Sequence, residues 1–134
     1  MSEIDWVELR RAATAAMRRA YAPYSRFPVG AAGLVADGRV VTGCNVENAS
    51  YGLTVCAERV ALWKAVSEGE REFVAVAVVS ASEHPASPCG ACRQLLWEFC
   101  GDIEVIIANL RGVRESHRLS QLFPHPFDRT FLTR

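Results

Sequence analysis

The feature that most constrains the fold is an uncharged, valine-rich run from Phe73 to Ser80, with β-branched residues at Val74, Val76, Val78 and Val79. Such a run is typical of a β-strand that is buried on both faces, because apolar side chains point to either side of it. A strand of this kind lies inside a sheet and needs other elements packed over each face. We therefore expect helices on both sides of one sheet.

Four further segments are predicted to be strands of the same sheet. Val29–Val35 and Val40–Cys44 are apolar runs separated by Asp37-Gly38, a dipeptide typical of a tight β-hairpin turn. These two segments are therefore expected to pair in antiparallel fashion. Ile103–Ala108 predicts another apolar strand, and Gly112–Leu119 predicts a weak, polar strand at an edge.

Three segments have the apolar spacing of amphipathic helices: Ile4–Tyr21, Val55–Glu68, and the stretch from Ser87 to Gly101. Ser2 or Asp5 is expected to cap the first helix, and Thr54 the second. Ser87 followed by Pro88 predicts an N-cap with proline at the first helical position of the third.

The order of these elements predicts the fold class. Helix, hairpin, helix, strand, helix, strand, strand indicates an α/β fold, a three-layer α/β/α sandwich around one mixed five-stranded sheet. A length of 134 residues is typical of one domain, here spanning residues 1–134. The second and third helices both follow strands or strand-exit loops, so their N-termini are expected to open on one edge of the sheet, where such folds usually bind ligands.

Composition excludes several classes of function. Half of the residues are hydrophobic, which excludes a disordered chain, and 15 basic residues balance 15 acidic ones. That balance argues against a protein that mainly coats nucleic acid or an anionic membrane. No stretch approaches the ~18 apolar residues of a spanning helix and no signal-peptide pattern is present, so we expect a cytoplasmic protein. Five cysteines in such a chain are interpreted as thiols or metal ligands.

Three of these cysteines are candidate metal ligands. Cys89 and Cys92 are three residues apart and would share one face of a helix, and Cys56 lies at the start of another helix. Helix N-termini favour thiolates, and three protein ligands leave the open fourth position of a catalytic zinc site. Two alternatives remain: a redox-active C-x-x-C pair, or a closed structural zinc site with Cys44, Cys100 or a histidine as the fourth ligand.

Two charged residues beside Cys56 extend this hypothesis. Glu58 is interpreted either as an acid that the helix dipole stabilises or, with three thiolates nearby, as a proton carrier for metal-activated water. Three thiolates also give the site a negative charge. Arg59 is the side chain expected to offset that charge by hydrogen bonding to ligand sulfurs, and an arginine on the surface is the alternative.

Three motifs resemble the small cytidine deaminases, over about Tyr21 to Phe127: Gly43-Cys44-Asn45-Val46-Glu47-Asn48-Ala49-Ser50-Tyr51-Gly52, Thr54-Val55-Cys56-Ala57-Glu58-Arg59 and Pro88-Cys89-Gly90-Ala91-Cys92-Arg93-Gln94. The resemblance implies a homotetramer with one zinc ion per subunit, acting in pyrimidine salvage. It also implies hydrolysis of cytidine and 2′-deoxycytidine to uridine and 2′-deoxyuridine with release of ammonia.

The resemblance also assigns roles at matching positions. It implies that Cys56, Cys89 and Cys92 bind zinc, that zinc-bound hydroxide attacks C4 of the base, and that Glu58 carries protons to ring N3 and to the leaving amine. The remaining implied contacts are with the substrate: Asn45 and Glu47 with the ribose 3′-hydroxyl, the Ala57 backbone with the pyrimidine, the Ser87 carbonyl with the 4-amino group, Phe27 with the base, and Ala49 and Tyr51 with the site of a neighbouring subunit.

The C-terminal tail matches the family less closely. Many relatives carry a Leu-Leu-Pro-x-x-Phe segment whose phenylalanine stacks on the base, and by spacing Phe127 is the corresponding residue. Asp128-Arg129-Thr130 follows it here, whereas an acidic continuation is common in the family.

Three other functions compete with this reading. A blasticidin-type nucleoside antibiotic is the alternative substrate, although Asn45 and Glu47 favour an ordinary ribose. A polynucleotide substrate is disfavoured because relatives acting on tRNA or DNA usually have His as the first ligand, and because no basic stripe is evident. A non-catalytic zinc-bound interaction module would not need Glu58.

Overall fold

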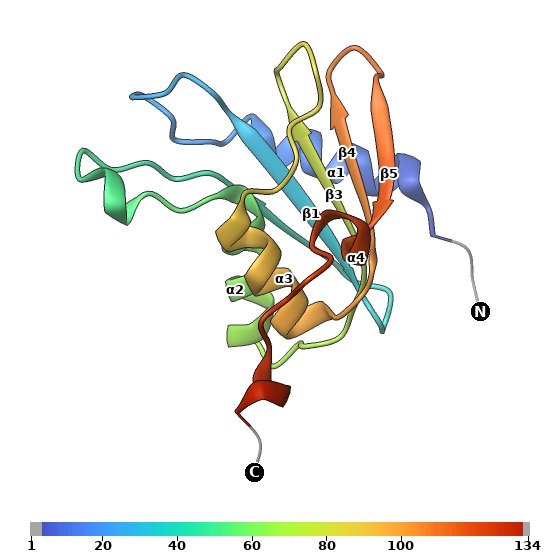
Figure 1. Ribbon diagram of the computed structural model, residues 1–134. Coiled ribbons are helices and arrows are strands. Elements are labelled where there is room, and N and C mark those ends of the chain that lie inside the picture. The colour runs from blue at the N-terminus through green and yellow to red at the C-terminus, as the bar shows by residue number, and fades with distance from the viewer. Residues whose placement is uncertain (1–3, 133–134) are drawn as a thin grey trace.

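The computed structural model describes residues 4–132, and its centre is one five-stranded mixed sheet (Figure 1). The strand order is β2-β1-β3-β4-β5. Their bounds are β1 Val29–Val35, β2 Val40–Cys44, β3 Phe73–Ser80, β4 Glu104–Asn109 and β5 Arg114–Arg118. The predicted bounds of the first three are confirmed. The bounds of β4 and β5 differ from the predicted ones by one or two residues.

Strand β3 is the middle of the sheet, as its sequence predicts. It pairs antiparallel with β1 and parallel with β4, and seven of its eight residues are buried. Only Val74, near the start of the strand, is exposed. The hairpin is also confirmed, because β1 and β2 pair antiparallel on either side of the Asp37-Gly38 turn.

Helices cover both faces of this sheet, which confirms the three-layer sandwich (Figure 1). Helix α1 (Trp6–Met17) packs on one face and buries Leu9, Ala13 and Met17, which recur at helical spacing. Helices α2 (Ala57–Ser67) and α3 (Gly90–Cys100) lie on the other face. Asp5 caps α1 by accepting a hydrogen bond from the Glu8 N–H, and the alternative cap, Ser2, lies outside the described residues.

Two glycines allow the helices to approach the sheet closely. A Cβ at Gly30 in β1 would lie 1.9 Å from the Ala13 carbonyl oxygen of α1. A Cβ at Gly43 in β2 would lie 2.4 Å from the Ala61 nitrogen and 2.6 Å from the Ala57 carbonyl oxygen of α2. Only residues without a side chain fit at these contacts.

The predicted caps of α2 and α3 are wrong. The N-cap residues are Cys56 and Cys89, and neither side chain makes a capping hydrogen bond. An isolated bridge between Val46 and Val55 keeps the chain extended past Thr54, whose hydroxyl instead accepts from the Asn48 N–H at 3.1 Å. Each helix consequently begins at a sulfur rather than at a hydroxyl.

The C-terminal segment runs back across the outside of α3. After a short helix, α4 (Leu119–Leu122), the chain passes along α3 to a 3-10 turn at Arg129–Phe131 (Figure 1). Gln94 Nε2 donates to the Phe127 carbonyl at 2.7 Å, and Trp97 Nε1 donates to Asp128 Oδ2 at 3.1 Å. Within residues 4–132, no helix combines the length and apolar character needed to cross a membrane.

Candidate metal centre and active site

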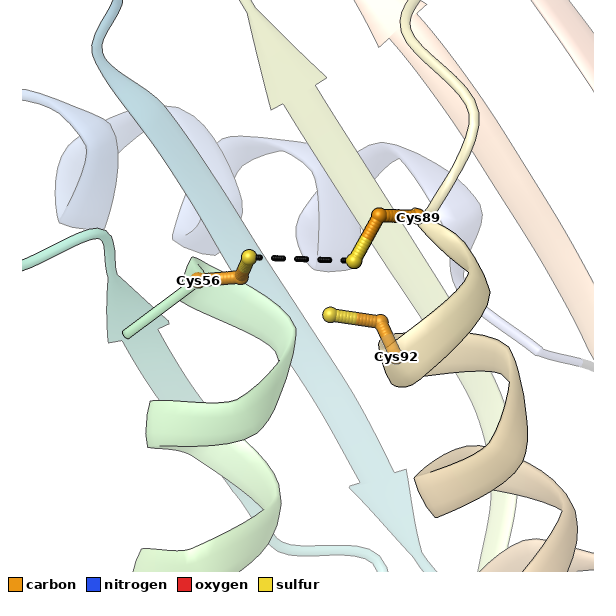
Figure 2. A group of neighbouring side chains, drawn as sticks. All are labelled: Cys56, Cys89 and Cys92. Carbon is orange, nitrogen blue, oxygen red and sulfur yellow. Dashed lines mark hydrogen bonds between the residues drawn. The ribbon is translucent and has the colours of Figure 1, made fainter. Parts of the chain in front are cut away.

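Three cysteine sulfurs meet where α2 and α3 begin. Cys56 immediately precedes α2, Cys89 immediately precedes α3, and Cys92 lies in the first turn of α3. Figure 2 shows the three side chains pointing toward one another from the two helix ends. All three sulfurs lie within 4.8 Å of one another, and Cys56 Sγ and Cys89 Sγ are 3.9 Å apart.

This cluster fits a zinc ion. Zinc–sulfur bonds of about 2.3 Å in tetrahedral geometry place two sulfurs about 3.8 Å apart, close to the observed separation. Among the described residues no other Cys, His, Asp or Glu joins the cluster, so the protein supplies three ligands. Cys44 instead borders a separate hollow with Ala16 and Lys64, and Cys100 packs in the apolar core. The arrangement therefore leaves the open fourth position of a catalytic site.

Arg59 compensates the negative charge of the sulfurs. Its Nη2 atom donates to Cys56 Sγ at 3.4 Å and to the Thr54 carbonyl at 3.3 Å. Its guanidinium also lies over the Trp63 ring, 5.9 Å from the ring centroid. A hydrogen bond from Cys92, together with Arg59, lowers the pKa of the Cys56 thiol to about 5. The same bond and burial raise the pKa of Cys92.

Glu58 is buried in the first turn of α2, with 7 % of its surface exposed. Burial raises the pKa of its carboxyl group to about 7. A group with a pKa near neutrality both accepts and donates protons readily under physiological conditions. Glu58 therefore has the protonation behaviour required of a proton carrier.

A cavity of about 240 Å³ opens beside the cysteine cluster. Eight of the residues singled out in the sequence line it: Phe27, Asn45, Glu47, Cys56, Ala57, Glu58, Ser87 and Cys89. A second hollow of about 350 Å³ shares Ser25, Glu47 and Thr54 with this cavity and reaches Tyr51. The structure thus brings the metal cluster, Glu58 and most of the expected substrate contacts to one place.

The carboxylate of Glu47 is held in place by the segment that precedes β1. Its Oε1 accepts from the Tyr24 N–H at 2.9 Å and the Ser25 N–H at 3.0 Å, and its Oε2 accepts from the Ser25 hydroxyl. The Ser25 hydroxyl bond is the main reason that the pKa of Glu47 lies below its usual value. Glu47 is consequently an oriented anion at the cavity wall.

The amide of Asn45 is fixed by the same segment. Its Oδ1 accepts from the Val29 N–H at 2.9 Å, and its Nδ2 donates to the Phe27 carbonyl at 2.9 Å. Asn45 and Glu47 are 8 % exposed each. The two side chains therefore line the cavity, and their hydrogen bonds also fix the shape of its wall.

Sequence reasoning missed several residues that line the cavity: Ser25, Val29, Thr54, Val78 and Ala86. Ser25 had a usable signal, since it is a small polar residue two positions before the expected contact Phe27. Val78 had none, because a valine inside a buried strand looks the same whether it faces packed core or a cavity.

Two expected contacts, Ala49 and Phe127, do not line the cavity of their own chain. Phe127 lies along α3, its ring stacked on Phe131 with centroids 5.3 Å apart, and 55 % of its surface is exposed. Ala49 belongs to the exposed loop that also carries Tyr51. Neither residue is therefore placed to contact a molecule bound in the cavity of its own chain.

The fold and the site together define the class of zinc deaminases. In this class a zinc ion held by three protein ligands acts on a nucleobase together with a nearby glutamate. The family model for the cytidine and deoxycytidylate deaminase zinc-binding region matches residues 5–109. The chain belongs to this family.

Individual relatives agree with that assignment. The chain is 53 % identical to a cytidine deaminase of Halalkalibacterium halodurans over 125 residues, 92 % of this chain and 95 % of the relative. It is 51 % identical to a cytidine deaminase of Sporosarcina psychrophila over 119 residues, 88 % of either chain. The crystal structure of a cytidine deaminase from Burkholderia pseudomallei superposes with a TM-score of 0.89 at 48 % identity, covering 92 % of this chain and all of that one.

Proposed function

We propose that this chain is a zinc-dependent enzyme that hydrolyses cytidine and 2′-deoxycytidine to uridine and 2′-deoxyuridine with release of ammonia, as a step of pyrimidine salvage. The observation that carries the proposal is the position of Glu58. A buried carboxyl group with a near-neutral pKa shares one cavity wall with the zinc ligands Cys56 and Cys89. An interaction module would have no use for that arrangement.

In the proposed reaction, Cys56, Cys89 and Cys92 would hold a zinc ion, which would supply the Lewis acidity that makes water nucleophilic near neutral pH. Glu58 takes a proton from the attacking water, passes it to ring N3, and delivers a second proton to the amine. One C4–O bond forms and the C4–N bond breaks, so water and cytidine yield uridine and ammonia.

The cavity residues orient the nucleoside. The Ser87 carbonyl accepts from the 4-amino group, the Ala57 backbone meets the pyrimidine edge, and Phe27 covers the base. Asn45 and Glu47 bind the 3′-hydroxyl, a group that ribose and deoxyribose share, so both sugars are accepted. Arg59 keeps the thiolates charged by hydrogen bonding to Cys56.

We further propose a cytoplasmic homotetramer of single-domain subunits, residues 1–134, each holding one zinc ion. Exposed aromatic side chains support this assembly: Tyr51, which lines the second hollow, is 75 % exposed, and Phe127 is 55 % exposed. In the tetramer the loop of Ala49 and Tyr51 reaches a neighbouring subunit's site, and Phe127 stacks on a base bound there. Light scattering tests the subunit number.

The reaction is tested by the loss of cytidine absorbance with purified, zinc-loaded protein. We expect turnover of cytidine and 2′-deoxycytidine, and no reaction of cytosine within single-stranded DNA or RNA. Blasticidin S serves as the comparison substrate, because it lacks the ordinary ribose that Asn45 and Glu47 would bind. Stoichiometric zinc without turnover of either nucleoside would refute the proposal.

A further inference from the structure

Arg93 is a residue beside the metal site that the proposed chemistry does not use. It follows the ligand Cys92 directly on α3, and its guanidinium donates three hydrogen bonds in different directions. Nε donates to the Pro88 carbonyl at 2.9 Å, Nη2 to the Ser87 hydroxyl at 2.9 Å, and Nη1 to the Leu122 carbonyl at 3.0 Å. All three nitrogens of the planar group are therefore engaged.

The acceptors of Arg93 distinguish it from other arginines of the chain. Arg39 and Arg118 form ion pairs with exposed carboxylates. No ion pair to Arg93 occurs in the part of the chain that the structure describes, and its partners are two backbone carbonyls and a hydroxyl. A half-buried guanidinium bound only to neutral oxygens donates charge-assisted hydrogen bonds to them and forms no ion pair with them. Its contribution lies in fixing the positions of those oxygens.

Two of these three oxygens, the Pro88 carbonyl and the Ser87 hydroxyl, belong to the segment that leads into α3. Residues 85–89 have no regular secondary structure, and Pro88 has no N–H to donate. Ser87 lines the cavity, its hydroxyl accepts a hydrogen bond from Arg93, and its carbonyl oxygen is the acceptor proposed for the 4-amino group of the base. The direction of that carbonyl depends on the Ser87–Pro88 backbone, which Arg93 holds.

We propose that Arg93 is a positioning residue for the leaving-group end of the site. It orients the Ser87 carbonyl toward the 4-amino group of the base, and its bond to Leu122 braces this arrangement against the start of the C-terminal segment. Lysine cannot replace it, because one ammonium group cannot reach three acceptors spread around a plane. The inference rests on the proposed function, since it concerns the same substrate.

The test compares cytidine with uridine, which binds the same site but lacks the 4-amino group. In Arg93→Ala, kcat/KM for cytidine is expected to fall about 10- to 100-fold, because a misdirected acceptor weakens contact with the amine as it leaves. The inhibition constant of uridine should stay within about twofold, and zinc content should not change. The kcat/KM of Arg93→Lys for cytidine should lie between the values of Arg93→Ala and of the unaltered enzyme. If Arg93→Ala does not fold, Arg93→Lys provides the same comparison of cytidine with uridine.

Arg118→Ala is the matched control. Arg118 also bridges separate segments, donating to Asp102 and Glu104, but it lies outside the cavity. Both cytidine turnover and uridine inhibition should be unaffected by its removal. If the Arg93 variants lose cytidine kcat/KM and uridine binding by the same factor, or lose neither, the inference is overturned while the proposed function stays intact. Absence of turnover by the unaltered enzyme would refute both.

Discussion

Replacing Gly43 by alanine should displace α2 and so lower kcat by more than the accompanying loss of fold stability explains. The added methyl group would lie 2.4 Å from the Ala61 nitrogen and 2.6 Å from the Ala57 carbonyl oxygen. Ordinary contacts of this type are longer by about 1 Å, so α2 has to move away from β2 by roughly that distance. Both contacts involve the helix backbone, which cannot rotate aside as a side chain would.

The first turn of α2 bears Glu58, and Cys56 immediately precedes it. A shift of about 1 Å in a catalytic group can lower the rate on the order of 100-fold. Overpacking of this kind also destabilises a fold by about 1–3 kcal/mol. We therefore expect Gly43→Ala to lose about 100-fold in kcat per bound zinc ion, together with a moderate loss of stability.

Gly30→Ala is the matched control, because it creates a contact at least as close on the opposite face. Its methyl group would lie 1.9 Å from the Ala13 carbonyl oxygen of α1, a helix that carries none of the site residues. We expect a comparable loss of stability in urea with kcat per zinc kept within about threefold. If Gly43→Ala and Gly30→Ala lower stability equally and Gly43→Ala keeps its kcat, the Gly43 contact does not position α2.

Three other perturbations test separate features of the site and the core. Glu58→Gln should lower kcat by roughly 100- to 10,000-fold with zinc content unchanged, and activity within tenfold of the unaltered enzyme would contradict its role. Arg59→Ala should weaken zinc affinity by about 10- to 100-fold in chelator competition, because the Arg59 bond stabilises the Cys56 thiolate; an unchanged affinity would place Arg59 outside the site's function. Burial raises the pKa of Cys100 to about 12, so above pH 9 the unfolded thiol loses its proton while the folded one keeps it. The stability of the zinc-loaded protein should then fall by about 1.4 kcal/mol per pH unit up to pH 12, and Cys100→Ala should lack that part of the slope; identical slopes in urea titrations would refute the assignment.

Strands were predictable from the sequence because their signals are local. The valine run of β3 needs no knowledge of its neighbours to be recognised as a buried strand, and Asp37-Gly38 directly marks the turn of the β1–β2 hairpin. The three cysteines were also predictable as a cluster, since their spacing and their place at helix starts point to one ion.

The helix starts were not predictable in the same way. Thr54 and Ser87 have the chemistry of N-caps, yet each hydroxyl is bound elsewhere, to Asn48 and Arg93 respectively. These bonds join residues that local propensity does not relate. The cavity wall has the same origin, because Glu47 is oriented by Ser25 from 22 positions earlier in the chain. The placement of Phe127 depends on bonds between the tail and α3, which no local pattern indicates.

The hydrogen-bonded clamps formed by Asn45 and Glu47, the residues proposed to bind the sugar, restrict how the proposed site can be redesigned. Asn45 and Glu47 fasten Tyr24, Ser25, Phe27 and Val29 to the cavity wall even without a nucleoside. A substitution at Asn45 or Glu47 made to admit a different sugar would therefore also release the segment that carries Phe27, the residue proposed to cover the base. Selecting variants for new sugars should yield compensating changes near Ser25, whereas variants for new bases can arise around Val78 and Ala86 without loosening that segment. In the proposed site, specificity for the sugar should therefore be harder to change by substitution than specificity for the base.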